Sequence, residues 1–202
     1  MSKAEKTKQF IIEKTASLFN CKGYTSTSIS DITEATGLTK GSIYGNFENK
    51  EEVALEVYKH NADLVSKNML RSFGEEYTTS TDKLRAMVNF YRENWDIVFA
   101  TGGCPLMNAA TEADDTFPML RKQVKKSFEE WARKTSAVIR QGQIKGEIKR
   151  DCNADEYSSL FIMLIEGGIL LSKTTGKKEY LELVLNRILS IIDQELTICL
   201  PE

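Results

Sequence analysis

The stretch from Thr27 to Phe47 contains two short helix patterns joined by a tight turn. In the first pattern Ile29 and Ile32 lie three residues apart, so both fall on one face of a helix. Either Thr27 or Ser28 can cap the start of this helix, because a hydroxyl oxygen there accepts a hydrogen bond from a free backbone N–H. This stretch constrains the fold more tightly than any other part of the chain.

A glycine and a threonine separate the two helices. Gly37 stands where a helix end favours a left-handed residue, and Thr39 is in position to cap the second helix. The second helix has one inward pair, Ile43 and Phe47, at a spacing of four residues. Its other positions carry donors for phosphates or base edges: Thr39, Lys40, Ser42, Tyr44 and Asn46. Such a helix suits the major groove of DNA, and a core helix is the alternative interpretation.

Residues 10–58, with the sequence FIIEKTASLFNCKGYTSTSISDITEATGLTKGSIYGNFENKEEVALEVY, resemble the DNA-binding domain of the TetR/AcrR family of bacterial one-component regulators. The shared features follow in order: an aromatic residue after a glycine, a Thr-Ser cap, Gly-Leu-Thr-Lys-Gly, then Tyr and Phe, then Lys-Glu. The resemblance covers about a quarter of the chain. It implies a homodimeric transcriptional regulator that is not an enzyme. We predict a repressor that a small ligand releases from a palindromic operator in double-stranded DNA.

The resemblance also implies which residues contact DNA. Tyr44 and Lys50 correspond to family residues that meet the DNA backbone, whereas Gly45 stands where many members carry a larger side chain. Because Gly45 has no side chain, it cannot make the DNA contact available to those members. The bases would then be read by Thr39, Lys40, Ser42 and Asn46. The complete predicted set is Thr27, Ser28, Thr39, Lys40, Gly41, Ser42, Tyr44, Gly45, Asn46 and Lys50.

The remainder of the chain predicts further helices and no strand. We expect an all-α fold of about nine helices, with an N-terminal three-helix helix-turn-helix domain over residues 1–48 and a C-terminal bundle over residues 49–202 for ligand binding and dimerisation. Apolar residues at intervals of three and four predict one helix over about Thr81–Ala100 and a last helix over about Lys178–Ile198. A helix that starts at Pro118 is expected to fray near Gly142.

The run from Leu160 to Leu171 is apolar on every side of a helix except at Glu166, so it must be buried all round. One side can face the chain's own core and the other needs a partner, which predicts a homodimer through the last two helices. A monomer with an unusually apolar core is the alternative. For Glu166 we favour pairing with a basic residue across the interface over contact with a cationic ligand.

The break at Thr101–Pro105 lies beside large aromatic residues and is a natural place for a cavity. The predicted lining is Tyr91, Trp95, Phe99, Cys104, Met107, Asn108, Trp131 and Met163. Mostly apolar walls with Asn108 as a polar handle suit a modest hydrophobic or aromatic compound. The alternative is a thiol-based sensor of electrophiles or oxidants, in which the helix start beside Cys104 activates the thiol. We favour the pocket, because no second cysteine lies close in sequence.

Composition excludes several other classes. The net charge is −2, but residues 1–50 hold seven lysines against five acidic residues, which is the direction expected of a DNA-binding segment. The longest run with little charge is shorter than the roughly 20 residues that span a bilayer, so we expect a cytoplasmic protein without a membrane partner. Four dispersed cysteines and one histidine predict no metal site or cofactor. An enzyme with an accessory DNA-binding head lacks a nucleophile–base–acid set, and a pure scaffold does not explain the polar helix face.

Overall fold

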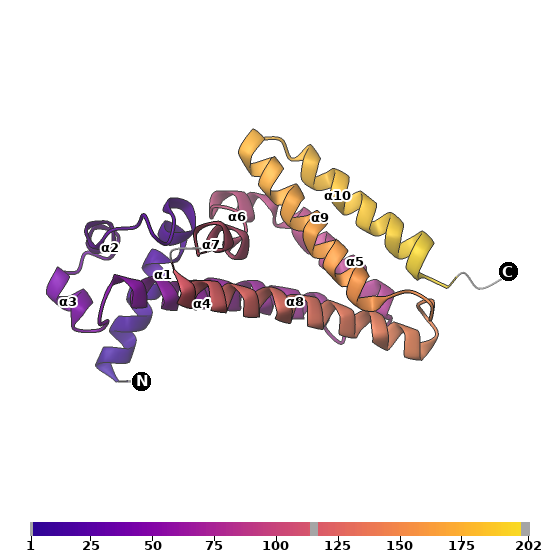
Figure 1. Ribbon diagram of the computed structural model, residues 1–202, viewed down its shortest axis with the longest axis horizontal. Coiled ribbons are helices and arrows are strands. Elements are labelled where there is room, and N and C mark those ends of the chain that lie inside the picture. Colours follow the sequence, from indigo (N-terminus) through magenta and orange to yellow (C-terminus); the bar gives the residue numbers. More distant parts are fainter. Residues whose placement is uncertain (1, 114–116, 199–202) are drawn as a thin grey trace. The chain divides into compact units, whose positions relative to one another are not determined.

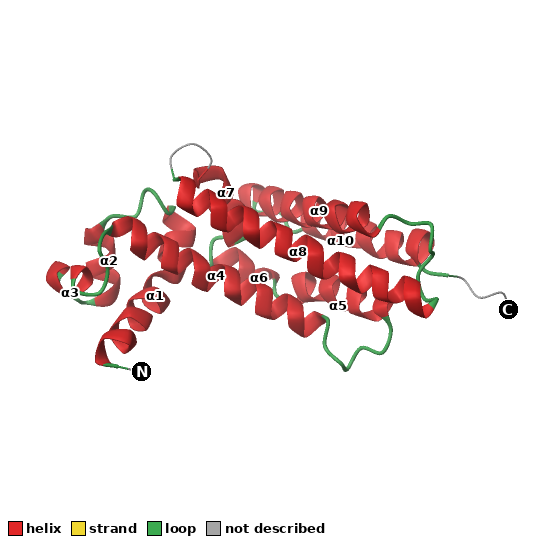
Figure 2. Ribbon diagram, turned by 60° about the horizontal axis from the view of Figure 1, so that its bottom comes forward, coloured by secondary structure: helices red, strands yellow, loops and turns green. Residues whose placement is uncertain are grey.

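The computed structural model describes residues 2–113 and 117–198, and these residues form helices joined by short loops (Figure 1, Figure 2). The helices are α1 (Lys3–Lys22), α2 (Ile29–Thr36), α3 (Lys40–Tyr44), α4 (Lys50–Ser72), α5 (Ser80–Glu93), α6 (Trp95–Ala100), α7 (Pro105–Ala113), α8 (Pro118–Lys145), α9 (Ala154–Thr175), α10 (Glu179–Ser190) and the π-helical turn η1 (Ile191–Leu196). The prediction of an all-α fold is confirmed. Within the described ranges, no helix has the length and hydropathy needed to cross a bilayer.

The chain forms two compact units, each assembled from segments that are distant in sequence. The first unit contains the described residues of Met1–Val65 and Ala100–Ser127, and the second contains those of Ser66–Phe99 and Phe128–Glu202. Helices α4 and α8 therefore contribute residues to both units. The functional division into residues 1–48 and 49–202 stays a prediction.

In the first unit, α1, α2, α3 and the first part of α4 enclose an apolar core. Its buried side chains include Ile11, Phe19, Tyr24, Ile32, Ile43, Phe47, Val53 and Tyr58. The rings of Tyr24 and Tyr58 meet edge to face with centroids 5.9 Å apart. Burial is the main reason that the pKa of Tyr24 lies well above its usual range, and it raises the pKa of Tyr58 to about 12. Both phenols therefore stay neutral and act as core side chains with a polar tip.

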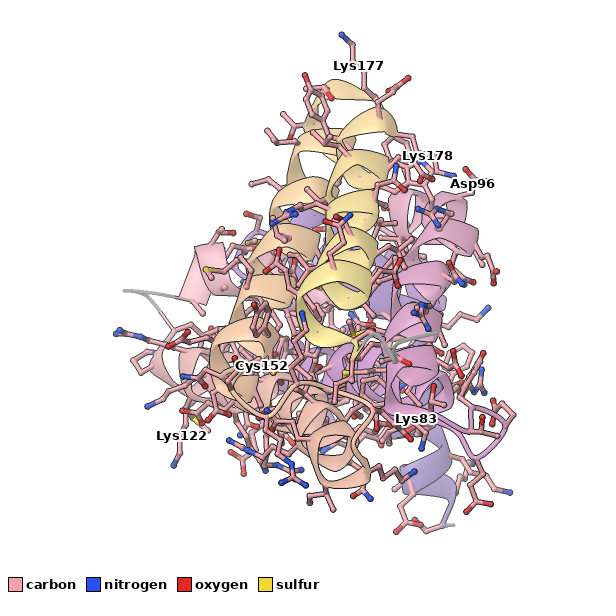
Figure 3. The ribbon with its side chains drawn as sticks, turned by 90° about the vertical axis from the view of Figure 1, so that its right-hand side faces the viewer. Lys83, Asp96, Lys122, Cys152, Lys177 and Lys178 are labelled. Carbon is pink, nitrogen blue, oxygen red and sulfur yellow. The ribbon has the colours of Figure 1, made fainter. Side chains whose placement is uncertain are left out.

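In the second unit, α9 and α10 are antiparallel neighbours, with Lys177 and Lys178 at the turn between them (Figure 1, Figure 3). Their approach is close at Gly168, where an added Cβ would lie 2.4 Å from Cγ2 of Val184. At the adjacent Gly167 an added Cβ would meet nothing within 4 Å. Only one glycine of the pair is therefore required for close helix approach.

The single helix predicted over Thr81–Ala100 is in fact two helices, α5 and α6, which meet at Asn94. Both the backbone N–H and the side-chain Nδ2 of Asn94 donate to the carbonyl oxygen of Phe90, at 3.0 and 2.8 Å. Asn side chains compete in this way with the helical hydrogen-bond ladder and favour helix ends. The apolar spacing continues across Asn94, so the helix break is not visible in the periodicity.

The last predicted helix also ends differently, because α10 passes into η1 before the chain straightens. The backbone N–H and the hydroxyl of Thr197 both donate to the carbonyl of Ile192, at 2.9 and 2.6 Å, which closes a wider turn than an α-helix has. An isolated antiparallel β-bridge then pairs Thr197 with Ile148. Near the end of α8, Gly142 lies inside the helix and not at a frayed end. Its missing Cβ leaves room for Ile148, whose Cδ1 would otherwise lie 2.7 Å away.

Candidate DNA-binding helix-turn-helix

Helix α2 begins with a reciprocal capping box. The hydroxyl oxygen of Ser28 accepts a hydrogen bond from the N–H of Asp31 at 3.2 Å, and the carboxylate of Asp31 accepts one from the N–H of Ser28 at 2.8 Å. Lys22, at the end of α1, donates to the same carboxylate at 2.6 Å. Hydrogen bonds from Lys22 and then from Ser28 hold the pKa of Asp31 well below its usual range. Of the two residues predicted to cap this helix, Ser28 is the one that does so.

The turn between α2 and α3 uses Gly37 and Thr39 in the roles predicted from the sequence. Gly37 ends α2 with φ of 69°, in the left-handed region that glycine adopts without strain. The hydroxyl oxygen of Thr39 then accepts a hydrogen bond from the N–H of Ser42 at 3.2 Å and so caps α3. Such a cap contributes about 1 kcal/mol to helix stability. The turn fixes the direction of α3 relative to α2.

Helix α3 has one buried side and one exposed side. Ile43 and Phe47 are both buried and anchor this segment, but α3 ends at Tyr44, so Phe47 lies three residues past the helix and not within it as the spacing predicted. Thr39, Lys40, Gly41 and Gly45 are exposed, and Tyr44 keeps 51% of its surface accessible. Ser42 and Asn46 are half-buried, and the Asn46 amide donates to the carbonyl of Ser42 at 2.8 Å. The exposed side offers hydroxyl, ammonium and phenol groups to a partner.

Like the helix caps Ser28 and Thr39, two further predicted DNA contacts make hydrogen bonds within the chain. Thr27 is fully buried and its hydroxyl donates to the carbonyl of Gly23 at 2.7 Å, which corrects the expectation that this side chain faces DNA. The ammonium of Lys50 donates to the carbonyl of Thr25 at 2.6 Å and so holds the turn before α2. An ammonium has three donors, and a phosphate contact by Lys50 is therefore compatible with this bond.

An ion pair that was not predicted from the sequence holds the two ends of this assembly together. Lys8 in α1 donates to the carboxylate of Glu52 in α4 at 2.7 Å, and its ammonium lies 4.7 Å from the ring centroid of Phe47. Glu52 also accepts a hydrogen bond from the N–H of Glu48 at 2.7 Å. The contact with Lys8 is the main cause of the lowered pKa of Glu52. A sequence pattern gives no signal for this pair, because its partners lie 44 residues apart.

The predicted ligand-lining residues fall in both units. In the second unit, Tyr91, Trp95 and Trp131 are buried, and the rings of Tyr91 and Trp131 stack with centroids 6.3 Å apart. Phe99 is 44% exposed and contacts Trp95. Met163 is 63% exposed on α9, so its side chain faces solvent in the single chain and does not line an interior cavity.

The other predicted lining residues, Cys104, Met107 and Asn108, belong to the first unit. The Asn108 amide donates to the Asn20 carbonyl at 3.1 Å, to the Asn20 side-chain oxygen at 3.0 Å and to the Gly102 carbonyl at 2.8 Å. These bonds fasten α7 to the end of α1, and they occupy the group that was predicted to be a polar handle. Cys104 is 7% exposed, which does not favour a redox sensor, because sensor thiols need access.

Helices α9 and α10 each expose a row of apolar side chains at helical spacing. The most exposed are Met163, Leu170, Leu171, Tyr180 and Leu183. Other residues of the same helices, including Phe161, Ile165, Leu181, Leu185 and Ile188, are buried within the unit. Glu166 is 3% exposed and so belongs to the buried side. We call the exposed row on these two helices the α9–α10 strip.

The comparisons with known proteins agree with this geometry. The family described as "Bacterial regulatory proteins, tetR family" matches residues 11–57, and the family described as "Tetracyclin repressor-like, C-terminal domain" matches residues 80–188. The chain belongs to the TetR family. It is a helix-turn-helix transcriptional regulator and not an enzyme.

Relatives of this TetR-family chain match over nearly its whole length. A TetR-family regulator from Cytophaga hutchinsonii is 36% identical, with a TM-score of 0.93 and 99% of each chain covered. One from Chloroflexus aurantiacus is 33% identical, with a TM-score of 0.92 and 98% and 100% coverage. The HTH-type transcriptional repressor DhaR of Mycobacterium sp. GP1 is 26% identical over 175 residues, which are 87% of this chain and 86% of DhaR. The resemblance over residues 10–58 therefore extends to the helices of both units.

Proposed function

We propose that this TetR-family regulator is a repressor that binds a palindromic operator as a homodimer and is released by a small hydrophobic or aromatic ligand. The observation that carries the proposal is α3, where Lys40 and Tyr44 are exposed while Ile43 and, just past the helix end, Phe47 are buried and anchor it. A helix held rigidly on one side and polar on the other can enter a major groove without exposing apolar surface. The named repressor activity of DhaR supports repression over activation. Action on bacterial DNA implies a cytoplasmic protein.

Contacts within the DNA-binding set divide by chemistry. Lys50 and Tyr44 carry groups suited to phosphate oxygens, and such contacts position the protein without reading sequence. Lys40 projects from the first turn of α3, where recognition helices contact base edges. Ser42 and Asn46 are half-buried, and they support the helix more than they read bases. Sequence specificity should therefore depend more on Lys40 than on any other single side chain of α3.

Dimerisation is supported by the α9–α10 strip. The large side chains of this strip keep between 37% and 66% of their surface exposed in the single chain, which is unusual for so many neighbouring apolar residues. A second copy that covers the strip would bury these side chains, and each Å² of apolar surface removed from water stabilises the dimer by about 25 cal/mol. A homodimer can then present two α3 helices to half-sites roughly 34–36 Å apart, or a multiple of this distance.

Release by a ligand is supported by the aromatic group around Tyr91 and Trp131. Thr135, one turn after Trp131 on α8, is fully buried, and its hydroxyl has no hydrogen-bond partner among the described residues. Other buried or half-buried helical threonines, such as Thr15 and Thr36, donate to the carbonyl four residues earlier. An unsatisfied buried hydroxyl costs free energy, so a polar atom of a ligand or a water molecule would stabilise it. Thr135 replaces Asn108 as the polar group for an otherwise apolar ligand.

The experiment is a selection of bound fragments from genomic DNA, followed by a gel shift in the presence of competitor DNA. We expect the wild-type protein to bind an inverted repeat specifically. The Lys40→Ala variant should lose this preference for the repeat over competitor DNA. Sedimentation should give a dimer on the DNA and in solution. Uniform binding to all fragments, or tight binding of the repeat by a monomer, would refute the proposal.

A further inference from the structure

The second unit contains an open groove of about 470 Å³ between the end of α4 and the length of α5. Its walls differ in character from the aromatic group near Trp131, because charged side chains of both signs surround it. Arg71 comes from α4, Glu76 and Tyr77 from the following loop, and Phe90 and Glu93 from α5. The volume lies within the roughly 300–1,000 Å³ of small-molecule sites.

The charges in this groove fall into two groups. Arg85 is engaged, because its guanidinium donates to Asp82 at 3.1 Å and to Asp193 at 2.7 Å. By contrast, Arg71, Glu76 and Glu93 form no ion pair with other residues in the described part of the chain. One free cation and two free carboxylates thus converge on one hollow. Because none of the described protein groups neutralises them there, a ligand that carries both charges would satisfy them together.

We propose that this groove binds a small zwitterion, namely a free α-amino acid with an apolar side chain. Arg71 takes the ligand carboxylate, for which the planar guanidinium fork is suited. The ammonium group faces the carboxylates of Glu76 and Glu93. The apolar side chain lies against Tyr77 and Phe90, whose rings supply contact area and attract the adjacent cation. The site is separate from the hydrophobic ligand proposed above and does not depend on it.

The first test measures binding to the intact, isotope-labelled protein without DNA. A mixture of the standard free L-amino acids is expected to give saturable chemical-shift changes at the backbone amides of Tyr77 and Phe90. The amino acid that binds best is then compared with its decarboxylated amine and its deaminated acid. Each analogue loses one charge-assisted contact and should bind about tenfold more weakly. No saturable change at these amides, or an analogue that binds as tightly as the amino acid, overturns the proposal.

The second test places the ligand in the groove. Arg71→Gln should weaken binding of the amino acid about tenfold and make the affinity insensitive to removal of the ligand's carboxylate. Arg150→Gln is the matched control, because Arg150 is an exposed arginine in the loop between α8 and α9. It should bind like the wild type. Unchanged affinity in Arg71→Gln, with an unchanged circular dichroism spectrum, overturns the assignment of Arg71. DNA binding is not measured, so a failure here leaves the proposed repressor function untouched.

Discussion

A substitution at Gly168 should separate helix propensity from helix packing in the second unit. An alanine at this position would place its Cβ 2.4 Å from Cγ2 of Val184 and 3.3 Å from Cα of Leu181. The neighbouring Gly167 offers a matched control, because a Cβ there meets nothing within 4 Å. Both glycines lie inside α9, so replacement of either by alanine gains the same helix propensity, about 1 kcal/mol.

The clash decides the difference between the two variants. The γ-methyl group of Val184 cannot rotate away freely, because a β-branched side chain has one favoured rotamer in a helix. The Leu181 Cα belongs to the backbone of α10 and can move only with the helix. Overpacking of this kind costs about 1–3 kcal/mol. We therefore expect Gly167→Ala to be stabilised and Gly168→Ala to be less stable than Gly167→Ala by roughly 2 kcal/mol.

The assay is equilibrium unfolding in urea together with thermal unfolding. For a chain of this size the expected difference corresponds to roughly 4–8 °C in Tm. Val184→Ala in the Gly168→Ala background should recover at least about 1 kcal/mol of the loss, which a double-mutant cycle measures directly. Equal stabilisation of both alanine variants would refute the reasoning, since it would mean that α9 and α10 do not approach each other closely at Gly168.

Three further predictions concern DNA, assembly and pH. Lys50→Ala should weaken binding to all DNA sequences and reduce the slope of log affinity against log salt concentration by about one. Lys40→Ala should weaken binding to the operator more than binding to random DNA. Equal losses on both DNAs would mean that Lys40 contacts the DNA backbone and not a base. Leu183 is 66% exposed in the single chain, so Leu183→Glu should leave the fold intact but place a charge in the proposed dimer interface. Sedimentation should then show a folded monomer. A persistent dimer would mean that the α9–α10 strip is not the dimer interface. The lowered pKa of Asp31, caused by the lysine at the end of α1 and by the α2 cap, contributes stability that is present above the ordinary carboxyl pKa of about 4 and lost as the pH falls below it. On acidification, the Asp31→Asn variant should lose less stability in that pH range than Asp96→Asn, a control at an exposed aspartate. An identical pH dependence of stability in the two variants would contradict the role of Asp31.

Much of the helix-turn-helix could be predicted from the sequence, because its contacts are local. The Ser28 cap, the left-handed Gly37 and the Thr39 cap each involve partners within four residues. Ile43 and Phe47, four residues apart, were expected to be buried together from short-range spacing, and both are buried. Residue type and short-range spacing are therefore sufficient to fix this element and to indicate which of its positions face outward.

The tertiary structure decided the features that depend on distant partners. The Asn108 amide is occupied because α7 meets the end of α1. Thr27 is fully buried, although its hydroxyl donates to Gly23 only four residues earlier. Both residues have the side chain of a binding group, and the sequence does not show that their donors are already used. The same holds for Met163, whose spacing fits either a core or an exposed strip.

The sequence by itself thus determined the helical class, the DNA-binding element and the apolar character of the last two helices. Only the tertiary structure decided which polar groups remain available and that Gly168 rather than Gly167 lies against Val184. The physical reason is range. Caps and helical faces are set by neighbours within one or two turns, whereas burial and hydrogen-bond satisfaction depend on contacts between helices that are far apart in the chain.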